Sequence, residues 1–110
     1  MIVPRASDFK AGSESGLKIS SIILLDEIVE KISAKHHVGL DEMREVLNTS
    51  SHFRFVEKGH RRGENVYSAL GQTDSGRYLI IFFVHKKGNQ ALILSARDMT
   101  DAERKRYEKK

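Results

Sequence analysis

The sequence contains no cysteine, and this absence excludes disulfide bonds, thiolate metal sites and cysteine nucleophiles. No apolar run approaches the ~18 residues that a membrane-spanning helix requires. The N-terminal stretch also lacks the charged start and long apolar middle of a signal peptide. We therefore expect a soluble, cytoplasmic protein that does not associate with a membrane.

Motifs for cofactor-dependent chemistry are missing as well. Neither GxGxxG nor GxxxxGK[ST] occurs, so no phosphate loop for a nucleotide is expected, and there is no GxSxG nucleophile elbow. The chain has five histidines but lacks HExxH and any pair at i,i+4 spacing. His36 and His37 are adjacent and cannot both face one site on a helix. We predict that the protein uses no metal and no cofactor.

What the chain does contain is enough for one self-sufficient domain. A chain of 110 residues can bury roughly 60 to 70% of its unfolded surface. Residues 1–16 mix Gly, Ser, Pro and scattered charge without periodicity, so we predict a flexible leader followed by a domain over 17–110. The net charge is +4, with an acidic region over 26–48 and a basic region over 49–62. The protein is therefore expected to have one face that attracts phosphate.

Two apolar runs in the C-terminal half organise the predicted fold. Tyr78 to Val84 is the right length and composition for a central strand with both faces covered. A loop at 86–89 and a second apolar run at 91–94 complete a hairpin. Between Arg77 and Arg97 there are four Lys or Arg residues and no Asp or Glu. Positive charge at both ends of this hairpin favours an anionic partner.

The first half of the domain is predicted to be mainly helical. Residues 18–24 are either an edge strand or the start of the next helix, and we favour the strand. Asp26 is the predicted N-cap of a helix that ends near Lys35. A second helix is predicted from Leu40 to Asn48, where the asparagine closes it. We expect the two helices to form a short αα-hairpin that covers the sheet.

The remaining strands follow from alternation and turn residues. In residues 52–58, Phe53 and Phe55 alternate with Arg54 and Val56, which predicts a half-buried strand. A basic turn at 59–63 leads to another strand over 64–70, and a turn at 73–76 leads into the central strand. The predicted class is α+β: an N-terminal helix pair on a four-stranded antiparallel sheet, with an optional extra N-terminal strand and a C-terminal polar helix.

That last helix begins with a capping box. The Thr100 hydroxyl and the Glu103 carboxylate can each satisfy a free backbone N–H of the other residue. Beyond this start, the helix has little apolar surface besides Ala102 and Tyr107. It must lie on the surface, fray or contact a partner.

Basic residues at strand ends point to one kind of chemistry that needs no cofactor. Cleavage of RNA by the ribose 2′-OH requires cations that hold the phosphate and groups that move protons. Suitable side chains are Arg77, Arg97, Lys35, His36, His60 and Tyr107. The structural alternative, favoured for each residue taken alone, is that the arginines close strand ends, His60 is solvated and Tyr107 packs the last helix.

The expected register places these residues at two ends of the sheet. Arg77 and Arg97 come to one end, while His85 goes to the other end with the turn around His60. Whether the two arginines share a face is open, because a slip of one residue moves a side chain to the opposite face. The nuclease hypothesis requires that the guanidinium groups converge and are not each neutralised by a carboxylate.

Several short motifs in a fixed order resemble the BrnT family, toxins of bacterial toxin–antitoxin pairs. The similarity covers about 26–108, and its order and spacing are more specific than any single piece. The motifs are Lys35-His36, Gly63-Glu64, Gly76-Arg77, and Leu94-Ser95-Ala96-Arg97 followed by Glu103 and Tyr107.

The resemblance implies a RelE-like fold and a metal-independent endoribonuclease that inhibits translation. It also implies neutralisation by a small DNA-binding antitoxin, typically of the ribbon-helix-helix type, and a complex with that antitoxin. The candidate catalytic residues are then Arg77, Arg97, His36, His60 and Tyr107. The candidate RNA-binding residues are Lys35, Arg61, Arg62, His85, Lys86 and Lys87.

The sequence also departs from the family pattern. Where the family often has arginine, this chain has Val66 and Leu92, and His37 replaces a glycine between the first two helices. The leading hypothesis is a ribonuclease toxin in which Arg77 and Arg97 bind the phosphate, His36 or His60 moves a proton, and Tyr107 positions a base or leaving group. The alternatives are a non-catalytic binding protein of the same fold and a dimerisation module.

Overall fold

The structure is a computed structural model, and it describes residues 17–50 and 52–109. The predicted leader, residues 1–16, lies outside the described residues. The elements in chain order are β1 (Ser21–Ile23), α1 (Asp26–His36), α2 (Leu40–Thr49), β2 (His52–Lys58), β3 (Asn65–Gln72), β4 (Tyr78–Lys86), β5 (Gln90–Asp98) and α3 (Asp101–Glu108). The predicted α+β class is confirmed.

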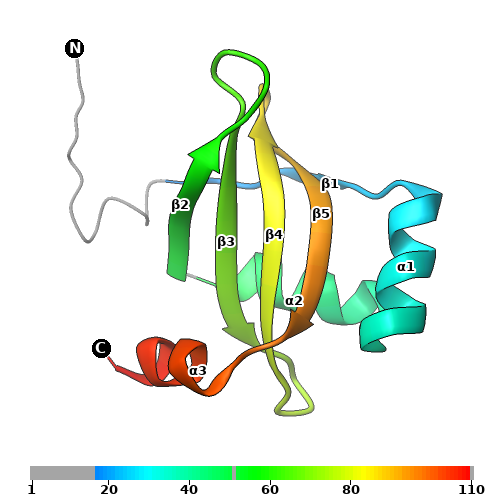
Figure 1. The fold of residues 1–110 in the computed structure, drawn as a ribbon, viewed down its shortest axis with the longest axis vertical. Coiled ribbons are helices and arrows are strands. Elements are labelled where there is room, and N and C mark those ends of the chain that lie inside the picture. The colour runs from blue at the N-terminus through cyan, green and yellow to red at the C-terminus, as the bar shows by residue number, and fades with distance from the viewer. Residues whose placement is uncertain (1–16, 51, 110) are drawn as a thin grey trace.

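The sheet has five strands in the order β1-β5-β4-β3-β2 (Figure 1). Strands β2 to β5 form the predicted antiparallel meander, with β4 at its centre. The optional N-terminal strand is present as β1, which pairs in parallel with β5 from Ser21 opposite Gln90 to Ile23 opposite Leu92, so the sheet has five strands rather than four. The β3 strand also runs two residues past its predicted end at Leu70.

The two faces of the sheet are covered to different extents. On the face toward α2, which we call the inner face, Leu79, Ile81 and Phe83 are completely buried. On the opposite, outer face, Ile80 is 2% exposed where α3 crosses the sheet, whereas Phe82 and Val84 are only half-buried. The prediction that both faces of β4 are covered therefore holds only near α3. The rest of the outer face is open.

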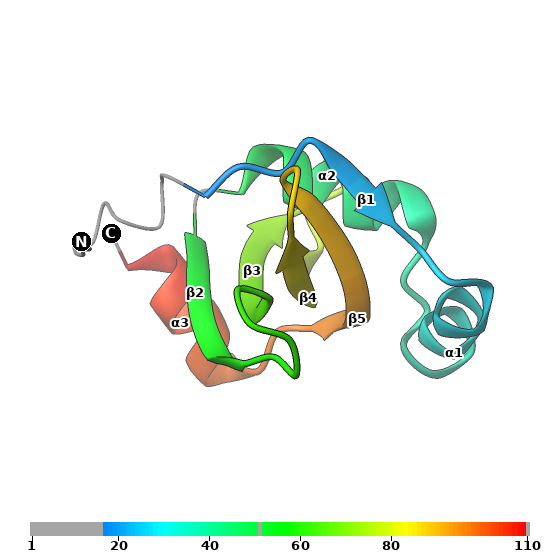
Figure 2. The ribbon, with the colours of Figure 1, turned by 90° about the horizontal axis from the view of Figure 1, so that it is seen from above.

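The helices α1 and α2 do not form the predicted αα-hairpin. Helix α1 packs mainly against β5, whereas α2 packs mainly under β3, and Figure 2 shows them apart at two sides of the sheet. Their joint turns sharply because His37 adopts a left-handed conformation with φ of 55°. Ile32 of α1 and Met43 and Val46 of α2 enter the core, so each helix packs on the sheet.

Two predicted helix ends are shifted by one residue. The N-cap of α1 is Leu25, whose carbonyl accepts the N–H groups of Ile28 and Val29, and Asp26 is the first helical residue. The Asp26 carboxylate therefore lies in the first turn, where its negative charge interacts favourably with the positive end of the helix dipole. Helix α2 continues through Asn48 to Thr49.

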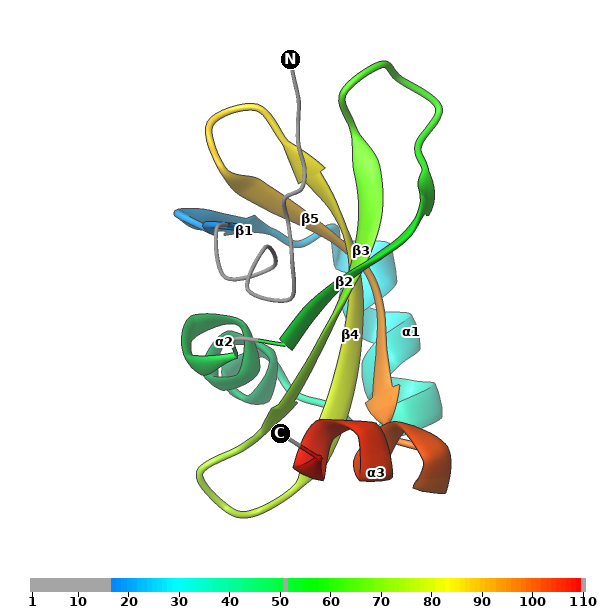
Figure 3. The same ribbon diagram turned by 90° about the vertical axis from the view of Figure 1, so that its left-hand side faces the viewer.

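Helix α3 lies across the outer face at the end of the sheet where β4 begins. Figure 3 shows it on the opposite side of the sheet from α2. The predicted capping box is confirmed: the Thr100 hydroxyl accepts the Glu103 N–H at 3.1 Å, and the Glu103 carboxylate accepts the Thr100 N–H at 2.9 Å. This cap fixes the direction in which α3 leaves β5, and with it the side chains that α3 holds over the sheet.

Candidate functional site

Arg77 is bound into the structure by four other groups. Its Nε donates to Asp98 Oδ1 at 2.8 Å, and Nη1 donates to Glu42 Oε1 at 3.2 Å. The same guanidinium donates to the carbonyls of His37 at 2.6 Å and His36 at 2.9 Å. The hydrogen bond to Asp98 raises the pKa of Arg77, and the reciprocal bond lowers the pKa of Asp98. Arg77 thus ties the joint between α1 and α2 to β4 and β5.

Arg97 lies at the same end of the sheet but on the outer face. Its guanidinium makes a two-pronged pair with Glu103, with N to O distances of 2.8 and 3.0 Å. It also lies 5.5 Å from the centre of the Phe82 ring. The bond from Arg97 lowers the pKa of Glu103. The prediction that these arginines share one end is confirmed, but Arg77 points to the inner side and each guanidinium is paired with a carboxylate.

A one-residue bulge decides this separation. Phe83 pairs with Ile93, but Phe82 pairs with Ser95, so Leu94 is an extra residue in β5. The bulge moves Arg97 opposite Ile80, whose side chain is on the outer face. Arg77 and Arg97 therefore do not converge and each is paired with a carboxylate, so the nuclease hypothesis fails in the form that places the phosphate between these two arginines.

Three side chains on the outer face were missed by the sequence reasoning, and two of them are arginines. Arg54 of β2 is on the same cross-strand row as Ser68 and Phe82. Arg106 of α3 lies close enough to Arg54 that the positive charge of Arg54 lowers the pKa of Arg106, after a larger lowering by burial. Within residues 17–50 and 52–109, neither arginine has an ion pair within 4.0 Å. We call Arg54, Arg97 and Arg106 the outer cation cluster.

The third missed residue is His52, two positions before Arg54 and on the same face. Its ring lies 4.8 Å from the ring of Tyr107, which also contacts Tyr78 at 5.9 Å. An imidazole and a phenol therefore border the outer cation cluster. Imidazole titrates near neutral pH and is the usual proton carrier in cofactor-free chemistry. Tyr107 is the one predicted site residue, besides Arg97, that the structure brings to this cluster.

A usable signal for part of this site was present in the sequence. Alternation in residues 52–58 places His52 and Arg54 opposite Phe53 and Phe55, and Phe53 is buried. That pattern predicts an imidazole and a guanidinium together on an open face. No comparable signal was available for Arg106, because its position depends on where α3 crosses the sheet.

The other predicted site residues lie elsewhere. Lys35 and His36 are in the last turn of α1, beside Arg77 on the inner side. His60, Arg61 and Arg62 are in the β2–β3 turn, and Lys87 is in the β4–β5 turn; both turns are at the far end of the sheet (Figure 1). That end is about 26 Å from the β4 start, because β4 has 9 residues and rises ~3.3 Å per residue. The expectation of two basic ends is confirmed.

Two of the basic residues at the far end are already bonded. Lys86 Nζ forms an ion pair with Glu64 at 3.0 Å. His85 Nε2 is hydrogen-bonded to the Lys18 carbonyl at 2.9 Å. By contrast, Lys58, Arg61 and Arg62 form no ion pair with any residue that the structure describes. Lys87 in the β4–β5 turn also has no ion pair with any described residue, so the free positive charge at this end lies on both turns, with most of it on the tip of the β2–β3 hairpin.

An open groove of about 640 Å³ lies on the outer face, next to this tip. Its floor is the cross-strand row Val66, Val84 and Leu92. Val66 and Leu92 are the two positions at which the resemblance leads one to expect arginine. They lie on either side of Val84, so a pair of cations has been replaced by a continuous apolar strip.

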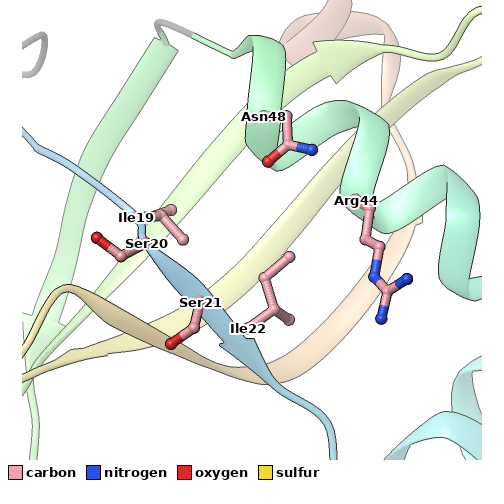
Figure 4. A pocket seen from close by; sticks show the side chains of 6 residues that line it. All are labelled: Ile19, Ser20, Ser21, Ile22, Arg44 and Asn48. Atoms are coloured by element: carbon pink, nitrogen blue, oxygen red, sulfur yellow. The ribbon is translucent and has the colours of Figure 1, made fainter.

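The rest of the described structure contains no stronger candidate for a functional site. Figure 4 shows a smaller hollow of about 240 Å³ between β1 and α2, with Arg44 and Asn48 on one side and Ser20 and Ile22 on the other. It brings together no group of titratable side chains. The described residues contain no cluster of three or more His, Cys, Asp or Glu that could hold a metal ion. None of the described helices is both long and apolar enough to cross a membrane.

These features define an α+β protein with a cationic, partly apolar sheet face. A comparison with protein families agrees: the model of the family described as "Ribonuclease toxin, BrnT, of type II toxin-antitoxin system" matches residues 29–103. The chain belongs to this family of BrnT ribonuclease toxins. A comparison with curated proteins gives no match. The matched segment contains Arg54 and Arg97, while Arg106 and Tyr107 lie just beyond it.

Proposed function

We propose that this protein is the toxin of a type II toxin–antitoxin system, with a RelE-like fold, and that it cleaves RNA internally at the outer cation cluster. The observation that carries this proposal is the Arg54 and Arg106 pair. Both side chains are exposed and neither has an ion pair among the described residues; desolvation and then the charge of Arg54 lower the pKa of Arg106, while the charge of Glu103 raises it. A bound phosphate would pair with both guanidinium groups and remove the repulsion between them.

Each side chain of the site has a proposed role. Arg54 and Arg106 bind the scissile phosphate and stabilise the charge that grows on it as the ribose 2′-OH attacks. Arg97, held by Glu103 over the Phe82 ring, adds positive charge from the β5 side. His52 accepts or returns a proton, with Tyr107 fixing its ring or positioning the leaving group. All these groups are side chains of the protein, so the proposed reaction needs no metal.

The remaining candidates receive other roles. Arg77 holds the fold together, and we propose that His36 and Lys35, which lie beside it, do not contact the reacting phosphate. His60 moves from the catalytic to the RNA-binding group, because its turn lies beyond the row through Asn65, which is about 10 Å along β3 from the cluster row through Ser68. Arg61, Arg62 and Lys87 are proposed to contact RNA away from the cleaved bond, together with Lys86. His85 is proposed to be structural.

The test is RNA cleavage by purified protein with and without EDTA. Arg54→Gln and Arg106→Gln should each lower the rate constant about 10²-fold or more, since each removes a donor from the transition state. Arg44→Gln is the matched control, because Arg44 is an exposed arginine of α2 on the other side of the sheet. Full activity in both site variants, or loss of activity in EDTA, would overturn the proposed site or its metal independence.

The cellular role follows from family membership. We propose that the protein inhibits translation by cutting RNA and that a small DNA-binding antitoxin, of the ribbon-helix-helix type, neutralises it in a complex. Expression alone should arrest growth, and co-expression of the adjacent reading frame should relieve the arrest. Growth without arrest would contradict a toxin role.

A second candidate function is a non-catalytic RNA-binding protein of the same fold. Val66 and Leu92 favour it, because they remove two positive charges from the outer face. In that case the protein would bind RNA and leave it intact, and Arg54→Gln would weaken binding while no cleavage is seen for the wild type. The cleavage assay therefore separates the two candidates directly.

A further inference from the structure

The apolar groove on the outer face lies between two concentrations of positive charge. On the α3 side is the outer cation cluster, whose row through Ser68 is two residues along β3 from the groove floor at Val66. On the other side is the hairpin tip, which carries Lys58 and Arg61. The rows through Ser68 and Asn65 are three residues apart, about 10 Å along the strand. Cationic, apolar and cationic surfaces thus follow one another within a short distance.

The groove itself is suited to a flat apolar group. Its floor consists of valine and leucine side chains from three neighbouring strands, and Leu94 stands beside it with 41% of its surface exposed. Of the two carboxylates at its edge, Glu64 is neutralised by Lys86, while Glu57 is not paired within the described residues. The floor therefore offers dispersion and desolvation to a ligand, while charge lies around it: cations at the two ends and the Glu57 carboxylate on the β2 side.

We propose that this groove binds a nucleobase of single-stranded RNA, next to the nucleotide whose phosphate occupies the outer cation cluster, with a flanking phosphate at the hairpin tip. The proposal rests on the function proposed above and names the form of the substrate. An unpaired nucleotide alternates an anionic phosphate with an apolar base face, which is the order of surfaces along the outer face. In a duplex the base faces are stacked and cannot reach the floor. Apolar protein side chains would fit the floor but would leave the positive charge at both ends unanswered.

The experiment measures binding of a short, fluorescent 2′-O-methyl RNA, which lacks the nucleophile and is not cleaved. Replacing Leu92 and Leu94 together by alanine should weaken binding about fivefold, which is near the smallest effect seen when one base contact is lost. The salt dependence of binding should not change. Replacing Lys58 and Arg61 together by glutamine should lower the slope of log K against log salt by about 1.4, since each phosphate contact on a single strand contributes ~0.7. Leu92→Tyr should tighten binding, because it widens the stacking surface.

Controls separate the groove from general effects. Phe55→Ala removes an exposed apolar side chain from the inner side of β2 and should leave affinity unchanged. A second control uses a series of oligonucleotides, each lacking the base at one position. For one member of the series, the leucine replacements should not change the affinity, because the base that the leucines contact is missing. The gain expected for Leu92→Tyr cannot arise from misfolding.

The outcomes distinguish this inference from the proposed function. Unchanged affinity in the double leucine variant, or equal binding of duplex and single-stranded RNA, would overturn the base site, and the groove would then be assigned to a protein partner. If that happened while Arg54→Gln still abolished cleavage, the proposed function would stand. If the wild type bound as described but never cleaved RNA, the base site would stand and the nuclease would fall.

Discussion

Replacing Arg77 by alanine should destabilise the fold without touching the outer cation cluster. The guanidinium joins three parts of the chain that are distant in sequence: the α1–α2 joint, Glu42 of α2 and Asp98 at the end of β5. Its removal leaves the carbonyls of His36 and His37 without their donors at the only connection between the two helices.

The magnitude follows from these bonds. A charged donor to a partly buried carbonyl contributes about 1 kcal/mol, and there are two such carbonyls. The carboxylate pairs must be discounted because Arg77 is 27% exposed and Asp98 is 62% exposed, so each contributes about 0.5 kcal/mol. The expected loss is about 3 kcal/mol of the free energy of unfolding. Arg77→Lys should recover about 1 kcal/mol at most, because one ammonium cannot reproduce the planar fork.

Urea unfolding monitored by circular dichroism measures the change. The matched control is Arg104→Ala, which breaks an exposed i,i+4 pair with Glu108 at 3.3 Å and should cost less than about 0.5 kcal/mol. A loss below about 1 kcal/mol for Arg77→Ala would refute the structural role.

The rate of RNA cleavage by Arg77→Lys, measured at a temperature where the variant is folded, should remain near that of the wild type. A loss of rate comparable to that of Arg54→Gln would mean that Arg77 takes part in catalysis.

Three further predictions concern stability. Asp98 and Glu103 have pKa values lowered by their arginine partners, so their contribution is complete above about pH 4 and is lost as pH falls through the lower folded values. Acid titration should show this loss, and it should be shallower for Asp98→Asn combined with Glu103→Gln. Thr100→Ala should cost about 1 kcal/mol and speed hydrogen exchange in α3, whereas equal exchange would argue against the cap. Gly71→Ala would place a Cβ 2.8 Å from Val46 Cγ1 and should cost about 1 to 3 kcal/mol, with partial rescue by Val46→Ala; additive losses would contradict the contact.

Much of the fold could be predicted because the signals are local. The alternation of residues 52–58, the capping box at Thr100 and the hairpin around 86–89 each depend on residues close together in sequence. The boundaries of β2 and α3 follow from them, as does the placement of Arg77 and Arg97 at one end of the sheet. The family resemblance rests on the same short motifs, and the family match confirms it.

The errors arose where long-range packing chooses between local alternatives. Pairing of β1 with β5 depends on an edge that no local pattern reveals, and each helix packs on its own part of the sheet, α1 on β5 and α2 on β3. The extra residue at Leu94 carries Arg97 to the outer face, because a bulge moves every later side chain of the strand to the opposite face, and its position is set by the pairing with β4.

The sequence by itself determined the class of the fold, the family, the order of the strands from residue 52 onward, and the charge that favours an anionic ligand. Only the tertiary structure decided which cations act together. It paired Arg77 with carboxylates on the inner side, and it brought Arg106 from the last helix to Arg54 on the second strand. The reason is that side chains act together only when they are close in space, and α3 crosses the sheet so that Arg106 comes near Arg54, 52 positions earlier in the chain.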